Sequence, residues 1–84
     1  MPILEFRRNR VQPWDVDQAQ GLILRDLEGL KDERLEGVGV SASRERRDTL
    51  YVEVTGVPDK IVDYVFGRVR QVLEKQGYTN ASRN

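Results

Sequence analysis

The stretch GVGVSASRERRDTLYVEVT, residues 37–55, decides the fold of this chain. On both sides of its charged centre, apolar residues alternate with small or polar ones, a pattern typical of two β-strands that each bury one face. One register places the apolar residues of the two runs opposite each other: Val38 opposite Val54, Val40 opposite Val52, and Ala42 opposite Leu50. The stretch therefore predicts a β-hairpin with a charged loop centred on Arg46.

A helix is expected before the hairpin, because apolar residues recur there at helical spacing. It should begin near Asp15, with Asp15 and Gln18 in the positions of a capping box. Trp14 would then pack against Ala19, one turn into the helix. The apolar stripe that would cover the buried face of the hairpin consists of Val16, Ala19, Ile23, Leu24, Leu27 and Leu30.

A second helix is expected after Gly56, with Pro58 at its first position, where the missing N–H of proline has no cost. Its apolar stripe consists of Ile61, Val62, Val65, Val69, Val72 and Leu73. Gly77 is suited to the C-terminal cap. Valine is a poor helix former, so this helix should depend on packing against the sheet.

Residues 2–8 are expected to form a short strand with Leu4 and Phe6 on one side, and an extended arm would give the same pattern. The order β-α-β-β-α then predicts an α+β fold, a two-layer sandwich with two helices on one face of a small antiparallel or mixed sheet. In this prediction residues 1–78 are one domain and residues 79–84 are a polar C-terminal tail.

Length and composition place the chain among small globular domains. A chain of 84 residues buries roughly 60–65% of its unfolded surface, which suffices for one core. It has no cysteine and therefore no disulfide, which suits a reducing compartment. No apolar run approaches the roughly 20 residues that span a bilayer, and the N-terminus lacks a signal-peptide pattern. We expect a cytoplasmic protein that does not bind a membrane.

The residue types present leave little room for catalysis. Without histidine or cysteine there is no imidazole base, no thiol nucleophile and no soft metal ligand. No glycine-rich phosphate-binding motif occurs. Two acidic groups, Asp15 with Asp17 and Asp32 with Glu33 and Glu36, have the chemistry of hard-cation ligands, but a helix cap and a solvated linker explain them as well. We expect no enzyme, no catalytic residue, no cofactor and no metal site.

The leading hypothesis is a protein-interaction or assembly module, with a homo-oligomer as the expected state. A partner would dock on the outer face of the hairpin or at a free edge of the sheet. The N-terminal strand would pair either within its own chain or across a dimer. The residues expected to contact the partner are Leu4, Phe6, Gly39, Ser41, Tyr51 and Glu53.

The alternative hypothesis is a small RNA-binding module, because arginine favours contacts with phosphate. Eleven of the fourteen basic residues are arginine, and Glu45 and Asp48 are interleaved with those of the hairpin loop. The candidate nucleic-acid contacts are Arg7, Arg8, Arg10, Arg44, Arg46 and Arg47.

Two family resemblances fall within residues 26–56. The segment Asp32-Glu33-Arg34-Leu35, followed by Val38-x-Val40-x-Ala42 and by residues 48–54, resembles part of the ribosome-binding factor A family. That resemblance implies a KH-like, ribosome-associated RNA-binding fold, although the sequence has no GxxG loop. The same segment is similar to the hairpin of phage baseplate sheath-initiator proteins, which implies a structural component of a phage tail. Each resemblance covers roughly a third of the chain.

Overall fold

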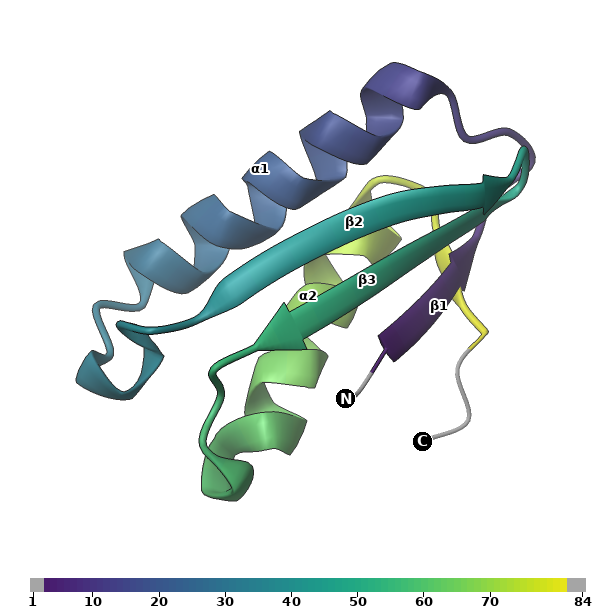
Figure 1. The fold of residues 1–84 in the computed structure, drawn as a ribbon. Helices are drawn as coiled ribbons and strands as arrows, with labels where there is room; N and C mark the ends of the chain where they lie inside the picture. Colours follow the sequence, from purple (N-terminus) through teal and green to yellow (C-terminus); the bar gives the residue numbers. More distant parts are fainter. Residues whose placement is uncertain (1–2, 82–84) are drawn as a thin grey trace.

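The computed structural model describes residues 3–81, which form two helices and four strands (Figure 1). The elements are β1 (Ile3–Arg7), α1 (Pro13–Gly29), the 3₁₀ turn η1 (Glu33–Leu35), β2 (Gly39–Arg46), β3 (Thr49–Thr55), the 3₁₀ turn η2 (Asp59–Ile61), α2 (Val62–Lys75) and β4 (Thr79–Asn80). Pro2 of the expected first strand and residues 82–84 of the expected tail lie outside the described residues.

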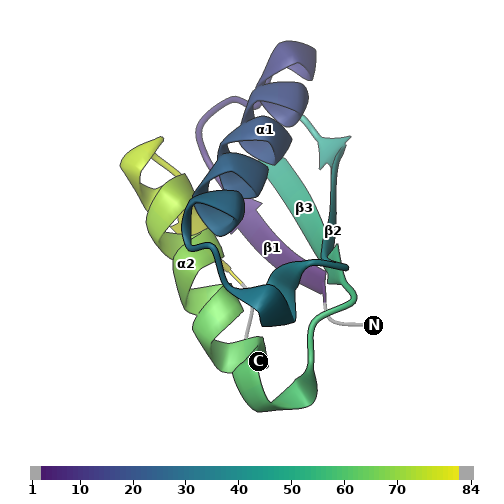
Figure 2. The ribbon, with the colours of Figure 1, turned by 90° about the vertical axis from the view of Figure 1, so that its left-hand side faces the viewer.

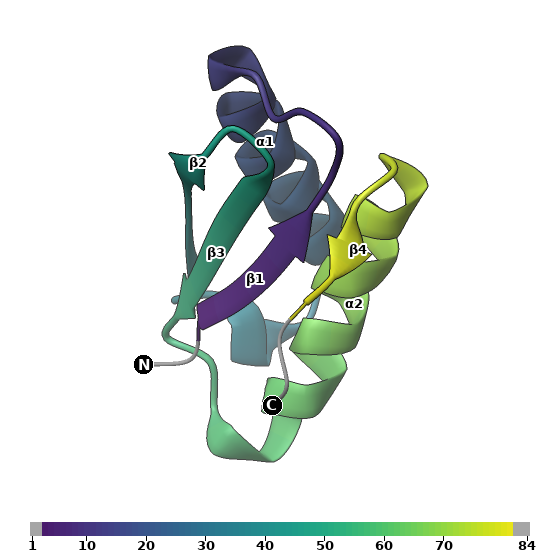
Figure 3. The ribbon, with the colours of Figure 1, turned by 90° about the vertical axis from the view of Figure 1, so that its right-hand side faces the viewer.

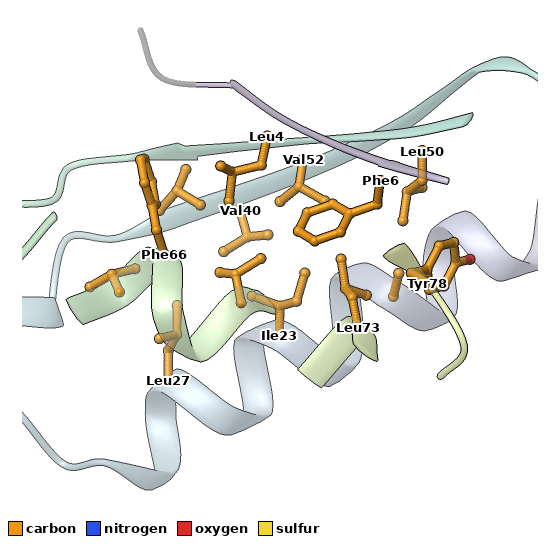
Figure 4. Close-up of a cluster of buried hydrophobic side chains, with 14 of the residues drawn as sticks. Leu4, Phe6, Ile23, Leu27, Val40, Leu50, Val52, Phe66, Leu73 and Tyr78 are labelled. Carbon is orange, nitrogen blue, oxygen red and sulfur yellow. The ribbon is translucent and has the colours of Figure 1, made fainter. Parts of the chain in front are cut away.

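The strands form one antiparallel sheet in the order β2-β3-β1-β4. Both helices pack on the same face of this sheet (Figure 2), so the predicted α+β architecture is confirmed. The core lies between the two layers (Figure 4), and its largest fully buried side chains are Leu4, Phe6, Val11, Ile23, Leu50, Val52, Val65, Val69 and Leu73. A bidentate ion pair of 2.7 and 2.9 Å between Asp26 and Arg68 joins the two helices at their surface.

The hairpin forms, but its register differs from the prediction by two residues. Its pairs are Val40 with Val54, Ala42 with Val52, and Arg44 with Leu50. A shift of two residues keeps the same side chains on the buried face, so the apolar alternation does not distinguish the two registers. The turn decides between them: Arg46 pairs with Thr49, which leaves a two-residue loop, and an irregularity between Arg44 and Arg46 absorbs one residue.

The first helix begins earlier than predicted. Pro13 is its first residue, and Gln12 precedes it in an extended conformation. Asp15 is the third helical residue, and its carboxylate accepts the backbone N–H of Gln12 at 2.7 Å, whereas the prediction made Asp15 the capping residue. The fixed φ of proline favours this position. Trp14 consequently lies in the first turn and is 66% exposed instead of packing against Ala19.

The second helix also starts differently from the prediction, because η2 precedes it and Pro58 lies before η2 in an extended conformation. Gly56, which has a φ of 76°, passes so close to the carbonyl of Gly37 that a Cβ atom at this position would collide with it. The close contact between the backbones of Gly56 and Gly37 therefore fixes the path of the chain from β3 into α2.

The C-terminus of α2 continues into an additional strand. Gly77 has a φ of 90°, its N–H donates to Glu74, and the N–H of Tyr78 donates to Leu73, so the helix ends in a Schellman motif. This turn directs the chain back along β1, where Thr79 pairs with Arg7 and Asn80 with Phe6. Gly77 is the predicted cap, but Thr79–Asn80 belong to the sheet and not to a polar tail.

The end of α1 contains a strained residue. Lys31 follows the helix with a φ of 52°, a conformation that costs a side-chain-bearing residue roughly 1–2 kcal/mol. Glycine adopts this conformation without strain, although it loses more entropy on folding. Lys31→Gly should therefore raise the free energy of unfolding by about 0.5–1 kcal/mol in urea titrations. Lys31→Ala keeps the strain and should give no increase, and an equal gain in both variants would contradict this account.

Candidate protein-interaction surface

Neither of the two helices within residues 3–81 covers the outer face of the sheet (Figure 3). Three rows of residues lie on this face; two cross it from β2 through β3 to β1, and the third joins β2 and β3 only. The rows are Ser43, Tyr51 and Glu5; Ser41, Glu53 and Ile3; and Gly39 with Thr55. Ile3 is 48% exposed, Ser41 and Ser43 are exposed, and Tyr51 and Glu53 are partly exposed. Four of the six residues predicted to bind a partner, Gly39, Ser41, Tyr51 and Glu53, therefore share one accessible surface, which we call the outer face.

The two-residue register shift changes the neighbours of Tyr51. The prediction placed Tyr51 opposite Ser41, but it lies opposite Ser43, and Ser41 lies opposite Glu53. Gly39 is therefore not covered by Tyr51. Thr55 lies opposite Gly39, and its Oγ1 would stand 2.7 Å from a Cβ at this position. The absence of a side chain at Gly39 makes room for Thr55.

The free edge of β2 is closed at one point by α1. The side-chain amide of Gln20 accepts the backbone N–H of Ala42 at 3.2 Å. Backbone groups alternate in direction along an antiparallel strand, so Val40 and Arg44 also direct their N–H and C=O groups toward this edge. A strand that paired with β2 would have to displace Gln20.

Leu4 and Phe6 do not belong to the candidate surface. Both are buried, and β1 pairs along its whole length with β3 and over its last residues with β4. The hypothesis that this segment pairs across a dimer is wrong for these residues. The alternation that suggested a strand was correct, but it did not show that the strand occupies the interior of the sheet, because two polar residues of β4 provide the second neighbour.

Half of the predicted nucleic-acid residues have contacts within the chain. Arg7 forms an ion pair of 3.1 Å with Glu5 on the same strand. The guanidinium of Arg44 donates to the carbonyl of Val11 at 3.0 Å and so fastens the hairpin to the start of α1. Arg8 pairs with Asp15 and donates to the carbonyl of Gln76. Arg10, Arg46 and Arg47 are exposed and have no side-chain partner within residues 3–81.

Arg8 and Tyr78 form a structural cluster that the sequence analysis missed. The Arg8 guanidinium lies 4.3 Å from the centre of the Tyr78 ring, pairs with Asp15 at 2.6 Å, and donates to the carbonyl of Gln76 at 3.0 Å. Tyr78 is only 4% exposed, and its hydroxyl has no hydrogen-bond partner among the described residues. The only sequence signal for this cluster was the aromatic residue directly after the helix-ending glycine.

Burial raises the pKa of the Tyr78 phenol above its ordinary value. The nearby Arg8 cation opposes this rise in pKa, and the Asp15 carboxylate adds to it. The cluster therefore keeps Tyr78 in its neutral form to higher pH than a tyrosine in the unfolded chain.

The acidic groups considered as cation ligands are dispersed. No three acidic side chains converge on a metal-sized site within residues 3–81. Asp15 serves the start of α1 and pairs with Arg8. Hydrogen bonds from the side chain and the backbone of Arg34 lower the pKa of the Asp32 carboxyl to about 2. Asp32 is thus an ionised capping residue of η1.

Comparisons with known proteins supply no family for this chain. No protein-family model matches it, and no match was found among curated proteins or among solved structures. The two resemblances in the sequence consequently receive no support from these comparisons. Among the described residues, no helix is long and apolar enough to cross a membrane.

The raised pKa of Tyr78 makes stability depend on pH in the alkaline range. As the pH rises above about 10, the unfolded chain releases this proton before the folded chain does, so the free energy of unfolding decreases. Tyr78→Phe removes this titration and should flatten the decrease above about pH 10, as measured by urea unfolding. Tyr64→Phe, at a tyrosine that is 49% exposed, should follow the wild type. Equal slopes for Tyr78→Phe and the wild type would refute the assignment.

Proposed function

We propose that this chain is a non-enzymatic protein-interaction module that docks a partner protein on its outer face. The supporting observation is that both helices cover the opposite face of the sheet (Figure 3). On the outer face, Ile3 is exposed and Tyr51 is partly exposed. An aromatic and an aliphatic side chain supply the apolar contact area of an interface, and tyrosine is enriched among residues that dominate binding energy.

The surroundings of these two residues suit a protein ligand. Ser41, Ser43 and Gly39 are small, so a partner's backbone can approach β2 closely. Glu53 adds a charged group at the centre of the face, where it would orient a partner that carries donors. The adjacent edge of β2 provides backbone hydrogen-bonding groups at Val40 and Arg44.

The charged groups favour protein docking over RNA binding. Arg7, Arg8 and Arg44 are held by Glu5, Asp15, Gln76 and Val11, so their positive charge or donors are partly satisfied within the chain. Tyr51 is the one aromatic residue in the three rows of the outer face. Sheets that read single-stranded RNA stack two or three bases on aromatic side chains.

Site-specific photo-crosslinking tests this proposal. Tyr51 is replaced by p-benzoylphenylalanine, and the protein is irradiated in the cells that produce it. We expect one adduct of defined mass from position 51, because this side chain would lie inside the interface. Ser41→Arg fills the neighbouring row with a bulky charge and should reduce the adduct at least tenfold.

The control is the same crosslinker at Tyr64, which is exposed on α2 and lies away from the outer face. It should not yield the adduct. Adducts of equal intensity from positions 51 and 64, or none from position 51, would refute docking on the outer face.

A further inference from the structure

The two ends of the molecule carry features that neither the core nor the outer face uses. α1 runs the length of the domain, with its N-terminus beside the hairpin turn and its C-terminus beside η1 (Figure 1). At 17 residues it is about 25 Å long, so the two ends cannot contact each other within one molecule. If a surface at one end of the molecule is complementary to a surface at the other end, the two surfaces can meet only between two copies of the chain.

The first end presents an exposed tryptophan among arginines. Trp14 is 66% exposed in the first turn of α1. The backbone N–H of Val11 donates to Arg47 and the guanidinium of Arg44 donates to Val11, so the start of the helix is bound to the hairpin turn. We call this end of the molecule the tryptophan end; it carries Trp14 in the first turn of α1, Arg10 just before the helix, and Arg46 and Arg47 at the hairpin turn bound to it.

The second end contains a groove between the last turns of α1, η1 and the start of β2. Its volume is about 660 Å³, within the range of pockets that hold compact ligands. Its apolar lining consists of Leu24, Leu27, Leu35 and Val38. Its rim consists of Glu28, Lys31, Asp32, Glu33 and Glu36. We call this surface the acidic groove.

The charges of the two ends are complementary. Residues 28–36 carry four carboxylates against two bases, and Arg34 is paired with Asp32, which leaves Glu28, Glu33 and Glu36 facing Lys31. At the tryptophan end, Arg8 pairs with Asp15, and Arg10 with the three arginines of residues 44–47 exceeds the acids Asp17, Glu45 and Asp48 by one positive charge. Opposite charges around apolar contacts favour association and fix its orientation.

We propose that the indole of Trp14 inserts into the acidic groove of a second copy of this chain, with Arg46 and Arg47 facing Glu33 and Glu36 on its rim. Tryptophan and arginine are the residues that most often dominate the energy of an interface. Each molecule offers one tryptophan end and one acidic groove, so contact between two copies leaves one of each free. Such a head-to-tail interface is heterologous and continues into a chain or closes into a ring.

This self-association is separate from the proposed docking on the outer face. It uses the ends of α1, whereas docking uses Tyr51 and its neighbours on the sheet. Ser41→Arg should therefore leave self-association unchanged, and loss of the crosslink at position 51 would not affect it. The two proposals fail independently.

Sedimentation velocity with two complementary variants tests the arrangement. Trp14→Ala removes the inserted side chain, and the double variant Glu33→Lys, Glu36→Lys reverses the charge of the rim at two exposed positions. We expect the wild type to form species larger than a dimer as its concentration increases. Each variant alone should associate at least tenfold more weakly, while Tyr51→Ala, which removes an aromatic side chain from the outer face, should behave as wild type.

Mixing experiments distinguish head-to-tail contact from a symmetric dimer. Trp14→Ala has an intact groove and the Glu33→Lys, Glu36→Lys variant has an intact tryptophan. One intact contact forms between them and leaves neither a functional groove nor a functional tryptophan free, so an equimolar mixture should form a 1:1 dimer with the affinity of a single wild-type contact and no larger species. A symmetric dimer would instead keep only one of its two contacts in the mixture and would associate more weakly than the wild type. A wild type that stays monomeric at every concentration, a mixture that stays monomeric, or a mixture that forms long chains would overturn the proposal.

Fluorescence reports on the contact directly, because Trp14 is the single tryptophan of the chain. The emission of the wild type should shift to shorter wavelength on association, and added salt should reverse part of the shift. Adding the fluorescence-silent Trp14→Ala variant to dilute wild type should produce the same shift by offering empty grooves. Adding a triple variant, Trp14→Ala with Glu33→Lys and Glu36→Lys, should produce none. Equal shifts with both additions would show that the groove is not the binding site.

Discussion

The fold depends on the central position of β1, which pairs with the hairpin on one side and with β4 on the other. Leu4 and Phe6 are buried in the core that both helices cover. Because β1 brings the N-terminal segment to the turn of the hairpin, Arg8 reaches both Asp15 and the ring of Tyr78. This one strand thus joins the hairpin, the start of α1 and the end of α2, three regions that are distant in the sequence.

The sequence predicted which residues face the core more reliably than which residues pair. Alternation identifies the buried face of a strand, and every apolar residue predicted to face inward from the hairpin is buried or packs against the core. The register also depends on the geometry of the turn. Residues 44–49 form a two-residue loop with a bulge, and the pattern of apolar residues does not indicate either feature. β4 was missed for a related reason: two polar residues give no alternation, and Tyr78 and Gly77 place them beside β1.

The roles of the charged side chains were the least predictable part of the candidate site. Arginine has the same sequence signature whether it contacts phosphate, a carbonyl or an aromatic ring. Arg8 and Arg44 stabilise the junction of β1, α1 and the hairpin, while Arg46 and Arg47 remain exposed two residues away. The difference arises from tertiary neighbours, namely Tyr78, Gln76 and Val11, whose proximity depends on the sheet order. Trp14 shows the same limit, because a one-turn error in the start of α1 changed it from a packed residue to an exposed one.

Within residues 3–81, the domain covers one face of its sheet with two helices, and neither helix covers the other face. The apolar stripes of both helices pack against the inner face of the sheet. Apolar side chains outside this core are therefore exposed to solvent or covered by another molecule. Ile3 and Tyr51 lie on the outer face, Trp14 at one end of α1, and Leu24 and Val38 at the other. Contiguous apolar patches rimmed by polar groups are typical of interaction sites, whereas singly exposed apolar side chains are common on any protein surface. Since these groups lie on three separate surfaces, a chain of copies joined through their ends would still present the outer face of every copy to a further partner.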